Sequence, residues 1–235
     1  MFTGILRYRN LKRDLNVIDP RLEQYYGKDG LIRKIDGPLQ GAADQGDQLA
    51  NNARLALATG DNVWMGAVLS HLMLEYGVFV RSNEPPWTDP KDVSRDQLLP
   101  VLIGMRYFML LGALETTLAK SLKHNCFPNL DLFLPHHKLA IGIKTLLGPS
   151  LLVCEVLIRI VDRWFSPDDT APTLNLTFMI WHSKKLFPDN RLVELARKLF
   201  CKMDFESDWT SYHREGTGTA PIHLFMKERY AEVRG

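Results

Sequence analysis

Apolar residues recur at helical intervals along most of this chain, and polar turns interrupt them at short spacings. Leu49 to Ala58 form one such stretch, which the turn at 59–62 ends, and Val63 to Met73 form the next. Spacings of three and four residues place apolar side chains on one face of a helix. A short polar turn between two such helices favours antiparallel packing. The pattern therefore predicts an antiparallel pair, from residue 41 to 59 and from 63 to 77.

The same periodicity continues towards the C-terminus. After a proline-rich loop at 78–90, it predicts a helical region from Ser94 to about Leu122, in which Pro100 has to lie in the first two turns. Gly148-Pro149 divides the stretch 137–165 into two helices. The last three predicted helices are Thr173 to Leu186, Asn190 to Met203 and Pro221 to Glu232.

These segments predict an all-α fold, a single-domain bundle of antiparallel helix pairs that covers residues 1–235. Residues 1–40 lack a sustained period, so an irregular N-terminal arm is expected there, and 204–235 form a polar and aromatic C-terminal segment. The chain is 46% hydrophobic and 24% charged, so it can bury a large core. Its apolar runs are too short or too often charged to span a membrane, and we expect no membrane association.

The net charge and the cysteine spacing indicate which classes of partner and which cellular compartment the sequence favours. The 29 Lys and Arg against 27 Asp and Glu leave a net charge of +2, too small for the electrostatic field of a nucleic-acid-binding protein. The three cysteines are far apart and form no Cys-x-x-Cys pair. Charges near the N-terminus interrupt the apolar core that a signal peptide needs. We therefore expect a cytoplasmic protein that binds no nucleic acid.

The densest polar cluster, residues 81–97, lies directly before a strongly apolar helix. Ser94 and Gln97 have the spacing of an N-cap and its capping-box partner, which is one interpretation of the cluster. In the other interpretation, the helix N-terminus faces a cleft with Arg95 and Asp96. Backbone N–H groups and the two charged side chains would then bind a substrate oxygen.

Two further side chains of this loop are candidate ligand-binding groups. Trp87 offers a flat apolar ring that suits a sugar, and Arg81 lies on the same loop. The alternative is that the tryptophan packs onto the body of the domain.

A second polar cluster lies on the first helix. Asp44, Asp47, Gln48 and Asn51 are three and four residues apart, so they share one face. One interpretation is a solvated helix surface, and the other is a site where two carboxylates and two amides converge. Several carboxylates also suit a hard cation, but the chain has no Asp-x-Asp-x-Asp-Gly loop and no His-x-x-x-His helix. We expect no metal and no cofactor.

The third cluster, residues 204–216, combines acids, aromatics and His213, a candidate general acid or base. Glycan hydrolysis requires two carboxyl groups that flank the bond, one protonated and one ionised. This segment, together with Asp96 or Asp47, would supply them after folding. The alternative is a polar tail that packs over the bundle. Elsewhere, His71 is expected in the core, while His182 has no evident partner.

The segment from Trp87 to Pro100 resembles an uncharacterised family of bacterial and phage proteins. An aromatic residue, the Asp-x-Ser-Arg-Asp-Gln core at 92–97 and the nearby proline carry this resemblance. Residues 44–54 and 220–225 are similar as well, and the family implies no activity. A looser similarity to (α/α)-toroid enzymes that hydrolyse, eliminate or epimerise sugars implies a partial toroid, although none of their catalytic motifs aligns.

The clusters favour a glycan-acting enzyme, a hydrolase in which Asp47, Asp96 and His213 are catalytic and an oligosaccharide is the substrate. The rival hypothesis is a non-enzymatic binding or assembly module, phage-encoded, and a metal-dependent hydrolase is a third. In a hydrolase the paired carboxyl groups should lie about 5 to 10 Å apart in an open pocket. The candidate substrate-binding residues are Arg81, Trp87, Ser94, Arg95, Gln97 and Asn51.

Overall fold

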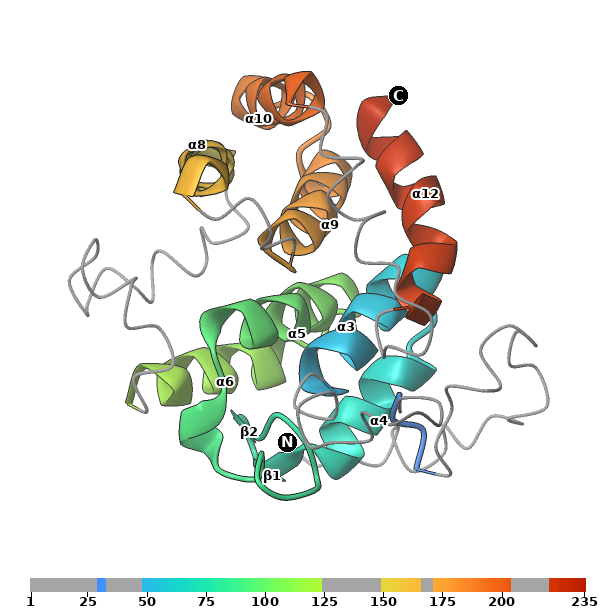
Figure 1. The fold of residues 1–235 in the computed structure, drawn as a ribbon, viewed down its shortest axis with the longest axis vertical. Coiled ribbons are helices and arrows are strands. Elements are labelled where there is room, and N and C mark those ends of the chain that lie inside the picture. Colours follow the sequence, from blue (N-terminus) through green and yellow to red (C-terminus); the bar gives the residue numbers. More distant parts are fainter. Residues whose placement is uncertain (1–28, 33–47, 124–148, 166–170, 204–219) are drawn as a thin grey trace.

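The structure is a computed structural model that describes residues 29–32, 48–123, 149–165, 171–203 and 220–235 (Figure 1). Of the described residues, 72% lie in helices, and the described β-structure includes one two-stranded sheet. The predicted all-α fold class is therefore confirmed, while the single-domain boundary stays a prediction. No helix in these ranges is both long and apolar enough to cross a membrane.

Eight described helices build the fold around one buried apolar core. Between α4 and α5 the chain forms the antiparallel strands β1 (Met73–Glu75) and β2 (Val78–Phe79) and the short 3-10 helix η3 (Pro90–Asp92). The helices are α3 (Gln48–Thr59), α4 (Val63–His71), α5 (Arg95–Tyr107), α6 (Leu111–Lys123), α8 (Pro149–Phe165), α9 (Ala171–Leu186), α10 (Arg191–Lys202) and α12 (Ala220–Arg234).

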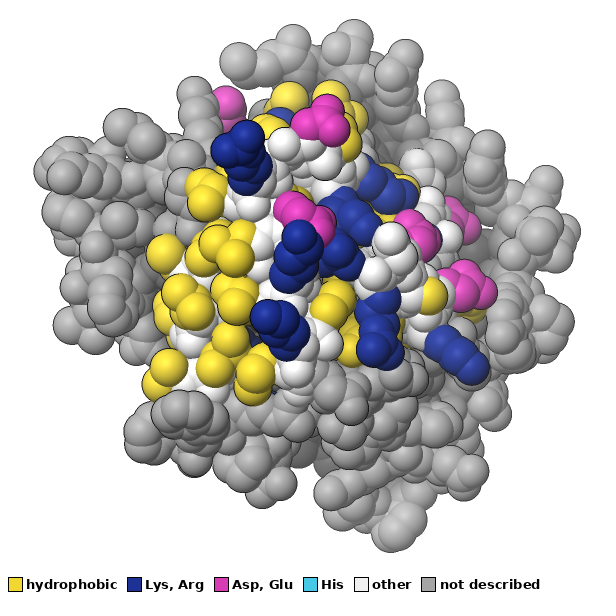
Figure 2. Space-filling model, turned by 90° about the horizontal axis from the view of Figure 1, so that it is seen from above, with side chains coloured by type: hydrophobic (Ala, Val, Ile, Leu, Met, Phe, Trp, Pro, Cys, Tyr) yellow, Lys and Arg dark blue, Asp and Glu magenta, His cyan; other side chains and the backbone are white. Residues whose placement is uncertain are grey.

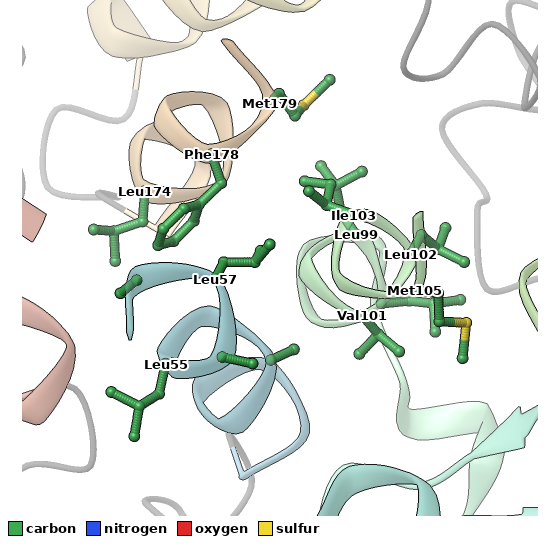
Figure 3. Packing of buried hydrophobic residues seen from close by; sticks show 14 of the residues in the cluster. Leu55, Leu57, Leu99, Val101, Leu102, Ile103, Met105, Leu174, Phe178 and Met179 are labelled. Carbon is green, nitrogen blue, oxygen red and sulfur yellow. The ribbon is translucent and has the colours of Figure 1, made fainter. Parts of the chain in front are cut away.

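The central element is α3, which packs against α4, α5, α9 and α12. Every residue from Gln48 to Ala58 is buried, since helices surround it on several sides. Alanine and leucine dominate its sequence, and both favour helix formation. Figure 3 shows Leu57 of α3 between Phe178 of α9 and the apolar side chains of α5. The predicted first helix is confirmed over 48–59, and its expected start at 41–47 lies outside the described residues.

The second predicted helix is shorter than expected. It ends at His71, and the chain then turns into the β1–β2 hairpin, so the predicted end at Gly77 was wrong. Gly77 has a φ of +85°, a conformation that favours glycine and that a helix cannot contain. His71, expected in the core, is exposed at the end of α4.

The predicted helix from Ser94 to Leu122 is two helices. The N–H of Leu110 donates to the carbonyl of Met105 at 2.7 Å, and that of Met109 donates to the carbonyl of Arg106 at 3.2 Å. This pair of bonds is a Schellman motif, which satisfies the last carbonyls of a helix and ends it. Met109 takes the left-handed position of the motif, with a φ of +60°. No glycine lies at the end of α5, and the apolar sequence continues across the break, so the sequence does not indicate the end of this helix.

The remaining helices begin and end close to their predicted positions. Pro149 opens α8, and Asn190 caps α10, where its side chain accepts from the N–H groups of Leu192 at 2.9 Å and Val193 at 3.4 Å. In Figure 1, α8 and α10 lie at one end of the molecule, and α4 and the hairpin lie at the other. The N-terminal arm at 1–28 and the segments 137–148 and 204–219 lie outside the described residues.

Candidate functional site

The loop before α5 folds back on itself. The Arg81 guanidinium lies 4.0 Å from the centre of the Trp87 ring, a cation–π contact. The N–H of Ser82 donates to the carbonyl of Trp87 at 3.1 Å, and the N–H of Leu49 donates to the carbonyl of Arg81 at 3.0 Å. The structure therefore brings the two predicted ligand-binding side chains together, with the arginine stacked on the ring that was expected to bind a sugar.

Ser82 is a buried residue of this loop that the sequence did not single out. Its hydroxyl donates to Oε1 of Gln48 at 2.8 Å, and Nε2 of Gln48 reaches the carbonyl of Ile32 at 3.4 Å. Asn52 continues the chain of contacts, accepting from the N–H of Ile32 at 2.8 Å. These hydrogen bonds fasten the loop to α3 and to residues 30–32. A single serine in a polar loop carries no sequence signal for such a contact.

The start of α5 has the predicted capping box. The N–H of Ser94 donates to Oε1 of Gln97 at 3.2 Å, and Gln97 is 5% exposed. In a capping box, two backbone N–H groups at the helix N-terminus that have no partner within the helix each find an acceptor. Arg95 and Asp96 lie in the first turn of α5, but their side chains lie outside the described part of the chain. The proposed cleft role of this terminus stays a prediction.

The described part of the predicted polar face, Gln48 and Asn51 of α3, is buried, which corrects the interpretation as a solvated surface for these two residues. The buried Arg54 donates through Nη1 to Oδ1 of Asn51 at 3.1 Å and through Nε to Oδ1 of Asn175 at 3.0 Å. Asn51, a predicted substrate-binding residue, therefore has its side-chain oxygen engaged by an arginine in the interior. Asp44, Asp47 and His213 fall outside the described ranges, so the predicted convergence of carboxylates remains untested.

A second buried arginine lies on the other side of α9. Arg159 of α8 is 3% exposed and donates through Nε to the hydroxyl of Thr173 at 2.8 Å. Guanidinium groups taken out of water require hydrogen bonds on several donors, and both arginines make further contacts besides these. The two arginines therefore hold α9 between α3 and α8. The sequence alone assigned no structural role to Asn175 or Thr173.

His182 is a buried titratable group on α9. It is 3% exposed, and within the described chain neither ring nitrogen has a hydrogen-bond partner. Burial, together with the charges of Arg106 and Lys185, lowers its pKa from 6.5 to about 4. The Tyr107 ring packs edge-on against it, with ring centres 5.7 Å apart. At neutral pH this imidazole is uncharged and cannot serve as a cationic ligand-binding group.

Beside His182, Trp181 forms a cluster that joins α9 to α12. Its indole N–H donates to Oε2 of Glu232 at 2.6 Å. The Lys185 ammonium lies 4.1 Å from the centre of the indole ring, and the Arg229 guanidinium lies 4.5 Å from it. Arg229 also donates to the carbonyl of Leu57 at 3.2 Å. The hydrogen bonds and cation–π contacts of these charged groups hold the C-terminal helix α12 against the core.

An exposed apolar surface lies across α8 and α10, which pack against each other. On α8 the exposed residues 154, 157, 158 and 161 have the spacing i, i+3, i+4, i+7 that helices normally bury. Figure 2 shows hydrophobic side chains gathered on this end of the molecule beside a band of Lys and Arg. We call the following residues the two-helix face: Leu157, Ile158 and Val161 of α8, and Leu192 and Leu195 of α10.

No known protein family matches this chain, and no curated protein or solved structure is significantly similar to it. The resemblance to a bacterial and phage family and the looser one to toroid enzymes therefore stay predictions. Within the described ranges, no three His, Cys, Asp or Glu side chains gather as metal ligands would.

Proposed function

We propose that this protein is a non-enzymatic binding or assembly module whose contact surface is the two-helix face. The observation that carries the proposal is the helical spacing of exposed apolar side chains on α8 next to exposed leucines of α10. Contiguous exposed apolar patches of this kind mark interaction sites in soluble proteins. The patch belongs to two regular helices that pack against each other, so it is a preformed surface.

Three of the candidate substrate-binding residues make contacts within the described chain. Asn51 holds Arg54, Gln97 caps α5, and Arg81 stacks on Trp87. These contacts support a structural role for the loop before α5. The glycan-hydrolase hypothesis and its catalytic trio, Asp47, Asp96 and His213, remain the rival.

Photo-crosslinking from defined positions tests the proposal. The full chain is expressed in cells with p-benzoylphenylalanine at position 157 or at 195, and as a matched control at Tyr76, which is 45% exposed on the hairpin. We expect discrete crosslinked species from 157 and 195 and none of these species from 76. Equal crosslinking from all three positions, or none at all, would overturn the proposal.

An activity assay tests the rival with the same protein. A panel of defined polysaccharides is incubated with the full chain, with Asp47→Asn and with Asp96→Asn, and the release of reducing ends is measured. We expect no release above the level of heat-denatured protein. Release by the natural sequence that either substitution abolishes would establish a hydrolase and contradict a non-enzymatic module.

A further inference from the structure

The surface next to the two-helix face is basic. The segments 171–203 and 220–235 together carry nine Lys and Arg and four Asp and Glu, although the whole chain is nearly neutral. On α10 the exposed Arg191, Lys198 and Lys202 flank Leu195, and we call these three residues the basic row. Within the described chain Arg191 and Lys202 have no ion pair, and Lys198 has only a 3.6 Å contact with Glu194. The basic row is therefore available to a partner.

Helix geometry places the basic row and the apolar side chains in one surface. Arg191 and Lys198 lie four and three residues from Leu195, and Lys202 lies four residues beyond Lys198, so all four side chains share the outward face of α10. Leu192, also exposed, lies three residues before Leu195 on the same helix. Figure 2 shows hydrophobic side chains on one side of this end of the molecule and, next to them, Lys and Arg with a few Asp and Glu.

We infer that the two-helix face binds an amphipathic helix of a partner protein, with apolar residues along its centre and Asp or Glu along the edge that meets the basic row. This inference rests on the proposed function. A helix laid over two packed helices inserts side chains at i, i+3, i+4 and i+7 between theirs. Acidic residues on one edge complement the basic row and fix the orientation of the bound helix.

Charge argues against two occupants, a second copy of this chain and the segment 137–147. Two copies that met through this face would bring two basic rows close together, and like charges at an interface cost free energy. The apolar segment 137–147 carries Lys138 and Lys144 and no carboxylate, so it has the wrong charge as well. An acidic partner avoids both conflicts.

The shape of the two-helix face favours a partner helix, rather than an anionic membrane, as the occupant. Its five side chains are between 40% and 48% exposed, so neighbours cover more than half of each. Elsewhere in the described chain, Leu74 is 61% and Met109 is 70% exposed, as projecting side chains are. Membrane-surface helices typically insert Trp, Phe and Leu into the lipid, whereas the five described side chains of this face are all aliphatic. A shallow aliphatic surface suits another helix.

A displayed peptide library tests the inference with the full-length protein. Each 18-residue member is an amphipathic helix in which the central positions vary among Leu, Ile, Met and Phe, and the edge positions vary among Glu, Gln and Lys. Selection is run against the natural sequence, against Leu157→Glu/Leu195→Glu, and against Lys198→Glu/Lys202→Glu. Lys91→Glu, an exposed lysine on η3, is the control for charge alone. Circular dichroism and thermal unfolding establish that each variant is folded.

We expect the natural sequence and the Lys91 control to enrich the same peptides, with Glu along one edge. The two leucine substitutions should lower the affinity of the selected peptides about tenfold or more. Reversal of the two lysines should lower it similarly and should select Lys in place of Glu at that edge, because the complementary charge is reversed. Enrichment without an acidic edge, or enrichment that the leucine substitutions leave unchanged, would overturn the inference.

Two further measurements address the other occupants directly. Sedimentation velocity detects self-association, and flotation with phosphatidylglycerol and phosphatidylcholine vesicles detects membrane binding. A dimer, or vesicle binding, that Leu157→Glu/Leu195→Glu abolishes would replace the partner helix as the occupant. Site-specific crosslinking from position 157 without peptide enrichment would overturn the helix inference and leave the proposed binding module in place.

Discussion

The Arg54 guanidinium donates to Oδ1 of Asn175 at 3.0 Å, across 121 positions of sequence, and both side chains are buried. A second donor of the same group reaches Asn51 on its own helix at 3.1 Å. Because a buried guanidinium has to be hydrogen-bonded, the contact restricts how α3 and α9 can lie against each other. A polar residue on the central helix therefore contributes to the position of a helix far away in the sequence.

Arg54→Met tests this contact. The substitution removes the donor from two buried amide oxygens, so we expect the free energy of unfolding to fall by about 2 to 4 kcal/mol. Urea denaturation followed by circular dichroism measures the change. The matched control is Arg191→Met on the exposed side of α10, which should change stability by less than about 0.5 kcal/mol. Similar losses in both variants would show that the buried hydrogen bonds do not matter.

The burial of Arg54 shows what local sequence patterns leave open. Gln48, Asn51 and Arg54 together resemble a solvated helix face, and the packing of α9, the loop before α5 and residues 30–32 against α3 makes that face internal. The capping box at Ser94 and Gln97, by contrast, was predictable because it involves residues three apart. Patterns within one helix are visible in the sequence, whereas the partners of a helix face depend on the whole fold.

The depressed pKa of His182 predicts a loss of stability in mild acid. Burial, with the charges of Arg106 and Lys185, lowers its pKa from 6.5 to about 4. The unfolded chain therefore binds a proton below about pH 6.5 that the folded chain does not bind until about pH 4. The contribution of this group is fully present above pH 6.5 and is lost as the pH falls. Between pH 7 and pH 5 we expect a loss of about 1 to 2 kcal/mol.

His182→Leu should remove most of that pH dependence, whatever its effect on stability at pH 7. Urea unfolding at pH 7, 6 and 5 measures the slope. This window lies above 4.5, the ordinary pKa of Glu194, which is lowered to about 2 in the folded protein, so that carboxylate contributes little to the slope. His71→Leu, at an exposed histidine, should keep the slope of the natural sequence. The hypothesis is wrong if His182→Leu and the natural sequence lose stability in parallel.

Met109 predicts a stabilising substitution. It occupies the left-handed position of the Schellman motif with a φ of +60°, and its side chain is 70% exposed. Glycine adopts this conformation without the Cβ clash, and little burial is lost. We expect Met109→Gly to raise the free energy of unfolding by about 0.5 to 1 kcal/mol, measured by thermal and urea unfolding. Met109→Ala should be close to neutral, and a destabilised glycine variant would contradict the prediction.

The break at Met109 and the two-helix face were beyond sequence reasoning for different reasons. The run from Tyr107 to Leu111 continues an apolar helical pattern, and a Schellman motif without glycine leaves no compositional mark. The apolar period of α8 was predictable. Which of its apolar residues are covered depends on how α9 and α10 pack on it, so the exposed positions at 157, 158 and 161 could be identified only in three dimensions.

Two glycines 11 positions apart should respond to the same substitution in opposite directions. Gly66 lies in α4, where an added Cβ would meet no atom within 4 Å beyond its chain neighbours and the backbone of its own helix. Gly77 has a φ of +85°, and its Cβ would lie 2.9 Å from the backbone nitrogen of Thr117. Alanine favours helix by about 1 kcal/mol over glycine, so Gly66→Ala should raise the free energy of unfolding by about 0.5 to 1 kcal/mol.

Gly77→Ala should lower the free energy of unfolding by about 2 kcal/mol or more, because the left-handed conformation and the contact with α6 both oppose a Cβ. Urea denaturation of both variants under the same conditions measures the difference. The pair separates a general effect of replacing glycine from the requirement at the hairpin turn. If Gly77→Ala were as stable as the natural sequence, the β1–β2 turn would have to adopt another conformation, and its packing against α6 would not restrict this position.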